Sequence, residues 1–194
     1  PAPFRESLFL HHFESKYMKL LVSAGSDKAF RFHSTYRFID DLIAINDNNE
    51  FNNSFKNIYP SQLELKVEHH GLHATFLDLD ISIRENMFVY KLFDKRDKFP
   101  FHVVRMPHEC SNIPSTIFYC SIFLEFLRIA RCTLLFEDLI PRASELFRRM
   151  TCQGGKASQI RKQIKIILTK YPSVFEKFNK RSDDLINEFI QNDV

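Results

Sequence analysis

Tyr36–Ile45 reads YRFIDDLIAI, with two adjacent aspartates, Asp40 and Asp41, between two short apolar runs. The β-branched and aromatic residues on both sides predict a strand, a tight turn and a second strand. Two carboxylates at a hairpin tip repel each other unless a cation lies between them. Mg²⁺ is typically held by one or two carboxylates together with substrate phosphates. The stretch predicts a divalent-metal site, with an ordinary acidic turn as the alternative.

The flanking sequence predicts helices and strands in the first part of the chain. Apolar spacing predicts helices over residues 4–22 and from Asp47 to about residue 60, and alternating patterns predict strands over 63–67, 75–83 and 87–93. The strand at 75–83 would place Asp78 and Asp80 on one face.

From residue 113 onward the pattern is helical. The predicted helices cover 113–132, 134–150 with an interruption near Pro141, 157–170, and about 173–191. In the third of these, the residues expected to point inward are Ile160, Ile164, Ile167 and Leu168. We therefore predict an α+β fold in which an antiparallel-sheet domain over 1–105 precedes an all-helical domain over 106–194.

The charge is unevenly distributed along the 194 residues, whose net charge is +3. Residues 142–181 carry 11 Lys and Arg against two acidic residues. A basic block of this kind predicts a polyanionic partner, with a solvated helix face as the alternative. No apolar run of about 18 residues is present, so we expect no membrane span and an intracellular protein. The four cysteines form no C-x-x-C pair, and we expect them to be buried, free thiols.

Several motifs resemble those of reverse transcriptases, and they occur in the same order along residues 1–135. Arg37–Asp41 resembles the aromatic-x-Asp-Asp motif, and Pro1–Phe4 resembles the end of the motif before it. Phe76–Ile81 resembles the strand that follows in retrotransposon enzymes, Penelope-like elements among them, and Phe93–Phe99 resembles the next strand and turn. The resemblance implies a polymerase palm segment over 1–105 followed by a helical, thumb-like domain over 106–194.

The resemblance also implies roles for individual residues. Asp40 would be a ligand of Mg²⁺ or Mn²⁺, and Asp41 would help to position the metal and the primer 3′-OH. Phe38 would pack under the primer terminus, although many family members have tyrosine there. Lys95 and Arg96 would contact the nucleic-acid backbone, with ordinary surface charge as the alternative. The thumb-like domain would follow the phosphates of a template–primer duplex with Arg148, Arg149, Arg161, Lys162 and Lys165.

The implied function is RNA-directed DNA synthesis, with an RNA template, a DNA primer and deoxynucleoside triphosphates as partners. In this family another metal-binding aspartate comes from an earlier strand, and no residue here matches it. Asp78 and Asp80 come too late in the order, so we expect them to be structural. We therefore expect an upstream polymerase segment and a chain that is catalytically incomplete alone. The alternatives are a non-catalytic nucleic-acid-binding remnant of a retroelement and a helical scaffold with an incidental acidic turn.

Overall fold

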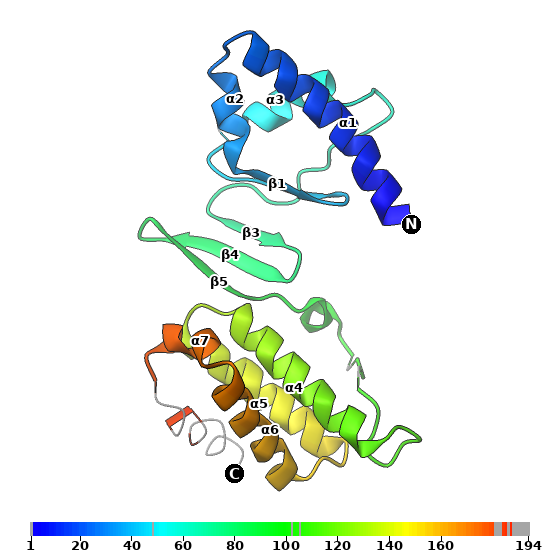
Figure 1. Ribbon diagram of the computed structural model, residues 1–194, viewed down its shortest axis with the longest axis vertical. Helices are drawn as coiled ribbons and strands as arrows, with labels where there is room; N and C mark the ends of the chain where they lie inside the picture. The colour runs from blue at the N-terminus through cyan, green and yellow to red at the C-terminus, as the bar shows by residue number, and fades with distance from the viewer. Residues whose placement is uncertain are drawn as a thin grey trace. The chain divides into compact units, whose positions relative to one another are not determined.

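The computed structural model describes residues 2–47, 49–101, 103–104, 106–180, 184–185 and 187. The fold is α+β, with small antiparallel sheets in the N-terminal half followed by a helical region (Figure 1). The chain forms two compact units, Pro1–His70 and Gly71–Val194, and the second contains a sheet as well as the helices. The division into palm-like and thumb-like domains at 105/106 concerns function and stays a prediction.

The first unit surrounds a hairpin with helices. Its elements are α1 (Ala2–Ser23), α2 (Lys28–Arg31), η1 (Phe32–Ser34), β1 (Thr35–Phe38), β2 (Asp41–Ala44) and α3 (Glu50–Ile58). The expected helices and hairpin are confirmed. After α1 ends, Gly25 adopts φ +62°, and the N–H of Ser26 donates to the carbonyl oxygen of Leu21, as in a Schellman cap. At the start of α3, both carboxylate oxygens of Asp47 accept the Phe51 N–H.

An aromatic core holds the first unit together. Phe51, Ile58 and Tyr59 are buried, and residues of α1 and β2 pack against them, including Phe13, Tyr17 and Leu42. Because α1 supplies a face of this core, it fixes the position of the hairpin.

The second unit begins with a three-stranded antiparallel sheet. Its strands are β3 (His73–Phe76), β4 (Leu79–Arg84) and β5 (Met87–Leu92), in the order β3-β4-β5. Glu85 and Asn86 form the two-residue turn before β5, and both have positive φ, at 50° and 61°. That combination is the one a type I′ hairpin turn requires at its two central residues.

The regular elements described after β5 are all helical. They are η2 (Lys95–Lys98), α4 (Ser115–Arg131), α5 (Phe136–Cys152), α6 (Ala157–Lys170), α7 (Pro172–Phe175) and η3 (Glu176–Phe178). The inward face expected for α6 is confirmed, since Ile160, Ile164, Ile167 and Leu168 are all buried. A Cβ on Gly155, between α5 and α6, would lie 2.8 Å from the Met150 carbonyl oxygen, so only glycine fits there.

Two strand predictions were wrong. Residues 63–67 form no strand, because they have no partner strand and their alternating side chains are mostly exposed. The predicted strand 75–83 is instead a hairpin, in which Leu77 and Asp78 form the turn between β3 and β4. Asp78 therefore lies at a tip, and it does not share a strand face with Asp80.

Other expectations also needed correction. Helix α5 continues through Pro141, which is exposed, so water can satisfy the carbonyl group that lacks its N–H partner. The last predicted helix is broken at Asn179, which has φ 50°, and its remainder falls mostly outside the described residues. The thiols are free, but Cys110, Cys120 and Cys152 are exposed and Cys132 is half-buried.

Candidate active-site hairpin and basic surfaces

The Asp40–Asp41 hairpin has a two-residue turn. The register pairs Phe38 with Asp41, so Ile39 and Asp40 form the turn itself. Ile39 has φ 56°, which is uncommon for a β-branched residue. Left-handed backbone costs a residue with a Cβ roughly 1–2 kcal/mol. Surrounding contacts must therefore hold this turn in place.

The two faces of the hairpin differ in burial. Partners across a strand pair lie on the same face, so Arg37 and Leu42 share the face that meets the core. Phe38 and Asp41 share the opposite face, together with Tyr36. Tyr36 is 56 % exposed and Phe38 is 54 % exposed. The predicted metal ligand Asp41 thus lies beside the aromatic ring that the resemblance assigns to the primer terminus.

Arg37 ties the hairpin to α1 and to its own turn. Its Nε lies 2.6 Å from Oε1 of Glu14, and its Nη2 lies 3.1 Å from Oε2. Its Nη1 also donates a 3.0 Å hydrogen bond to the carbonyl oxygen of Ile39. The hydrogen bond with Glu14 raises the pKa of Arg37, which is only 13 % exposed.

Tyr59 completes this cluster from the end of α3. Its hydroxyl donates a 2.5 Å hydrogen bond to Oε1 of Glu14. Burial raises the pKa of Tyr59, and the Glu14 hydrogen bond raises it further, so the hydroxyl stays a donor. Arg37, Glu14 and Tyr59 together hold the turn at a defined position relative to α1 and α3.

The two carboxylates at the tip are accessible. Asp40 and Asp41 are both exposed, and within the described ranges neither side chain has a hydrogen-bond or ion-pair partner. The same ranges contain no group of three or more His, Cys, Asp and Glu residues arranged to hold a metal ion. Two adjacent, unpaired oxygen-ligand groups suit a hard cation, but they supply only part of a coordination shell.

Asp78 has the same place in its hairpin as Asp40 but a different environment. Leu77, which precedes it in the turn, has φ 55°, close to the value of Ile39. Asp78 Oδ2 lies 3.1 Å from Nε of Arg128 on α4. Asp80 contacts His73 at 2.5 Å. Both carboxylates are therefore engaged within the second unit, in agreement with the structural role expected for them.

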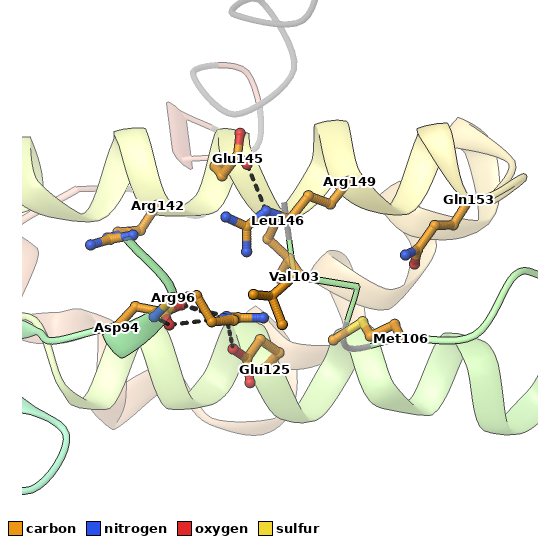
Figure 2. Close-up of a pocket in the computed structure, with 10 residues that line it drawn as sticks. All are labelled: Asp94, Arg96, Val103, Met106, Glu125, Arg142, Glu145, Leu146, Arg149 and Gln153. Carbon is orange, nitrogen blue, oxygen red and sulfur yellow. Dashed lines mark hydrogen bonds and ion pairs between the residues drawn. The ribbon is translucent and has the colours of Figure 1, made fainter. Parts of the chain in front are cut away.

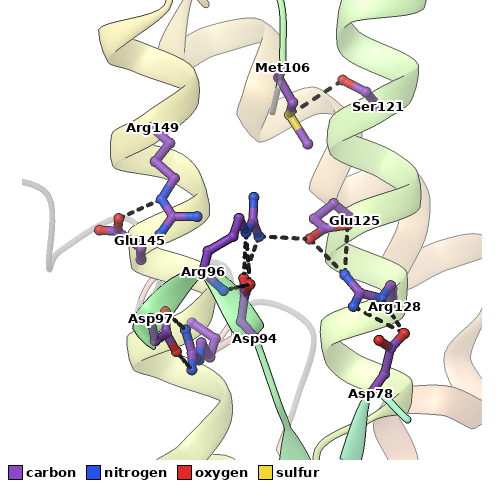
Figure 3. Close-up of polar contacts among 11 residues, drawn as sticks. Asp78, Asp94, Arg96, Asp97, Met106, Ser121, Glu125, Arg128, Glu145 and Arg149 are labelled. Carbon is purple, nitrogen blue, oxygen red and sulfur yellow. Dashed lines mark hydrogen bonds and ion pairs between the residues drawn. The ribbon is translucent and has the colours of Figure 1, made fainter. Parts of the chain in front are cut away.

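Lys95 and Arg96 lie on η2, and their side chains differ in exposure and in pairing. Lys95 is exposed, whereas Arg96 is 19 % exposed and its Nε lies 2.8 Å and 2.9 Å from the two Asp94 oxygens. Arg96 also reaches Glu125 of α4 at 3.6 Å (Figure 3). Burial alone would raise the pKa of Asp94, but the hydrogen bonds from Arg96 outweigh it and lower this pKa to about 2. The expected contact of Arg96 with the nucleic-acid backbone stays a prediction. Arg96 would first have to release Asp94 and Glu125.

A small pocket of about 40 Å³ lies beside this network (Figure 2). Its charged lining groups are Asp94, Arg96, Glu125, Arg142, Glu145 and Arg149. Cations and carboxylates balance among them, and the volume suits little more than water. We therefore assign this pocket no substrate.

The basic residues of α5 and α6 fall into two groups. Arg148 and Arg149 both pair with Glu145, at 2.8 Å and 2.6 Å. Helix α6 contains no acidic residue, and its exposed face carries Arg161, Lys162 and Lys165. No carboxylate partner for these three occurs in the described part of the chain. The uncompensated positive charge therefore lies on α6, in a different unit from the hairpin.

Sequence reasoning missed the residues that support the hairpin. Arg37 was read only as part of the motif, although its place two residues before Ile39 on the inward face of β1 could have marked it as buried. Its partner Glu14 lies 23 positions away in the chain, and Tyr59, which binds Glu14, lies 45 positions from Glu14. No local pattern connects the three residues.

Searches against protein-family models, curated proteins and solved structures found no match for this chain. Within the described residues, no helix is both long and apolar enough to cross a membrane.

Proposed function

We propose that this chain is the palm and thumb portion of a retroelement reverse transcriptase, and that it contributes to two-metal nucleotidyl transfer. The observation that carries the proposal is a hairpin, held to α1 by Arg37, with two unpaired, exposed carboxylates at Asp40 and Asp41. An acidic residue with a purely structural role in a turn can be paired with a cation. Asp78, in the turn between β3 and β4, is paired in this way with Arg128, whereas Asp40 and Asp41 have no partner in the described part of the chain.

Each residue of the hairpin has a distinct role in this proposal. Asp40 and Asp41 would hold Mg²⁺ or Mn²⁺, together with a further carboxylate from polymerase sequence outside this chain. When bound, the metal lowers the pKa of the primer 3′-OH and neutralises charge on the phosphates. Phe38 would pack against the primer terminus beside Asp41. Arg37 positions the turn through the Ile39 carbonyl group and touches no substrate.

The basic residues would bind the nucleic-acid backbone. Arg161, Lys162 and Lys165 on α6 are the strongest candidates, because their charge is not compensated within the described part of the chain. Lys95 is exposed and suits the same role, whereas Arg96, Arg148 and Arg149 are held by carboxylates. Contacts of this kind depend steeply on salt, because each neutralised phosphate releases counterions.

Metal binding by the chain itself tests the hairpin. We expect Mn²⁺ to broaden the NMR amide signals of residues 38–42 selectively, and we expect Asp40→Asn to abolish this broadening. The matched control is Asp27→Asn, a change at an exposed aspartate whose side chain makes no capping hydrogen bond. Broadening that is equal in both variants, or absent from the hairpin, would contradict the proposal.

A non-catalytic nucleic-acid-binding protein is the second candidate function. It is favoured by the incomplete ligand set, since the described residues offer no third metal-binding group near the pair. This candidate predicts salt-sensitive binding of nucleic acid through α6 and no dependence of any activity on Asp40.

A further inference from the structure

An exposed aromatic pair follows η2 in the second unit. Phe99 and Phe101 are 52 % and 63 % exposed, and their ring centroids lie 5.3 Å apart at an interplanar angle of 32°. The two adjacent rings present an apolar surface to water, and its burial by a partner would be favourable. Neither ring belongs to the buried core of this unit.

The turn that leads to these rings is anchored to two helices. Arg96 pairs with Asp94 and also with Glu125 of α4 (Figure 3). Asp97 accepts a hydrogen bond of 3.1 Å from Nη1 of Arg142 on α5. The turn immediately before the aromatic pair is therefore tied to two helices.

The segment that leads to the rings carries uncompensated positive charge. Asp94 and Asp97 are neutralised by Arg96 and Arg142, whereas Lys95 and Lys98 have no carboxylate partner in the described ranges. Residues three apart in a 3₁₀ helix lie one above the other, so Lys95 and Lys98 occupy the same side of η2. Lys98 also lies 4.9 Å from the centroid of the Phe93 ring.

We propose that Phe99 and Phe101, with Lys95 and Lys98, form a platform that stacks the bases of single-stranded nucleic acid. The inference rests on the proposed nucleic-acid function and concerns a site other than the hairpin and α6. Exposed aromatic rings beside backbone-binding cations are the combination that sequence-independent single-strand binders use. The platform would hold unpaired template or primer nucleotides.

A single strand fits better than a duplex for a simple reason. The faces of paired bases are covered by their neighbours in the stack, so a duplex offers the rings only its backbone and its ends. Unpaired bases can turn their faces toward Phe99 and Phe101, while their phosphates meet the lysines.

The absence of tryptophan from the sequence allows a direct test. Phe101→Trp introduces a single reporter at the platform and keeps an aromatic ring there. We expect oligo(dT) or oligo(U) of about 12 nucleotides, within the range of single-strand sites, to quench its fluorescence in a saturable way. A blunt duplex should bind without quenching. Adding Phe99→Ala should weaken the single-strand Kd by roughly 5- to 150-fold, the range given by losing one stacked base.

Matched controls separate the alternatives. Phe88→Ala removes another half-exposed ring, on β5, and should leave the Kd unchanged. Replacing Lys95 and Lys98 with Gln should weaken binding and reduce its salt dependence. Unchanged affinity in the Phe99→Ala variant would overturn the proposal, as would quenching by anionic lipid vesicles but not by oligonucleotides. Asp40→Asn should not alter quenching, so failure of the platform and failure of the metal site are distinguishable.

Discussion

Arg37 fixes the backbone of Ile39, because its Nη1 donates a 3.0 Å hydrogen bond to the Ile39 carbonyl oxygen. The contact explains how a β-branched residue keeps φ at 56° in the turn that presents Asp40. The same guanidinium is paired with Glu14 on α1, so the position of the turn depends on a helix that lies far from it in sequence. Contacts with Arg37 and α1 thus hold the acidic tip in place.

Removing Arg37 should destabilise the first unit. Arg37→Ala leaves the partly buried Glu14 carboxylate without its cation, which typically costs about 3 kcal/mol. Urea unfolding followed by far-UV circular dichroism measures this loss in the free energy of unfolding. Arg5→Ala is the control, since Arg5 is an exposed arginine on α1, the helix that carries Glu14, and should change stability by less than about 0.5 kcal/mol. Equal effects of the two changes would refute the role given to Arg37.

Asp94 should make the second unit sensitive to acid. Its pKa in the folded protein is about 2, below the ordinary value of 3.8. A lowered pKa stabilises the fold above the unfolded-state pKa, and this contribution disappears as the pH falls from about 4 toward 2. Its size is about 2 kcal/mol. Asp94→Asn should lose that amount at pH 7, and its stability deficit relative to the parent protein should shrink toward pH 2. A deficit independent of pH would contradict the assignment.

The helices and the hairpin were predictable because their signals are local. The apolar residues of α6 recur at helical spacing, and Asp47 precedes the apolar positions of α3, so periodicity and capping located both elements. Residues 63–67 have an equally regular alternation, but a strand also needs a partner, and sequence alone could not show that none is present. Leu77–Asp78 was missed as a turn because the apolar alternation at Leu77, Leu79, Ile81 and Ile83 runs through it without a break.

The hairpin that carries Asp40 and Asp41 was predictable from its own flanks, whereas metal binding by these residues stays a prediction. The pairing of Arg96 with Glu125 could not be predicted, because it is a contact between residues far apart in sequence. The pairing of Arg148 and Arg149 with Glu145 was open to prediction, because it joins residues three and four positions apart on one helix, but this signal was not used.

The salt dependence of nucleic-acid binding should depend on the unpaired basic residues of α6 more than on Arg148 and Arg149 of α5, which are paired with Glu145. Replacing Arg161, Lys162 and Lys165 with Gln should lower the slope of log K against log salt by up to about 3, roughly 0.9 for each lost phosphate contact. Replacing Arg148 and Arg149 with Gln should change the slope much less, because Glu145 already holds both side chains. Fluorescence anisotropy with a labelled duplex at several salt concentrations measures both. A larger effect of the α5 pair would show that the binding face was misassigned.

Primer extension tests the central claim most directly. The protein to be tested is this chain joined to the upstream polymerase segment that the proposal requires. It is assayed on a primed RNA template with deoxynucleoside triphosphates and Mg²⁺. We predict extension that is abolished by chelation of the metal and reduced at least about 1,000-fold by Asp40→Asn, since a metal-held charge is worth several kcal/mol in the transition state. Asp27→Asn should extend normally. Extension that survives Asp40→Asn, or that the 194-residue chain performs alone, would contradict the account.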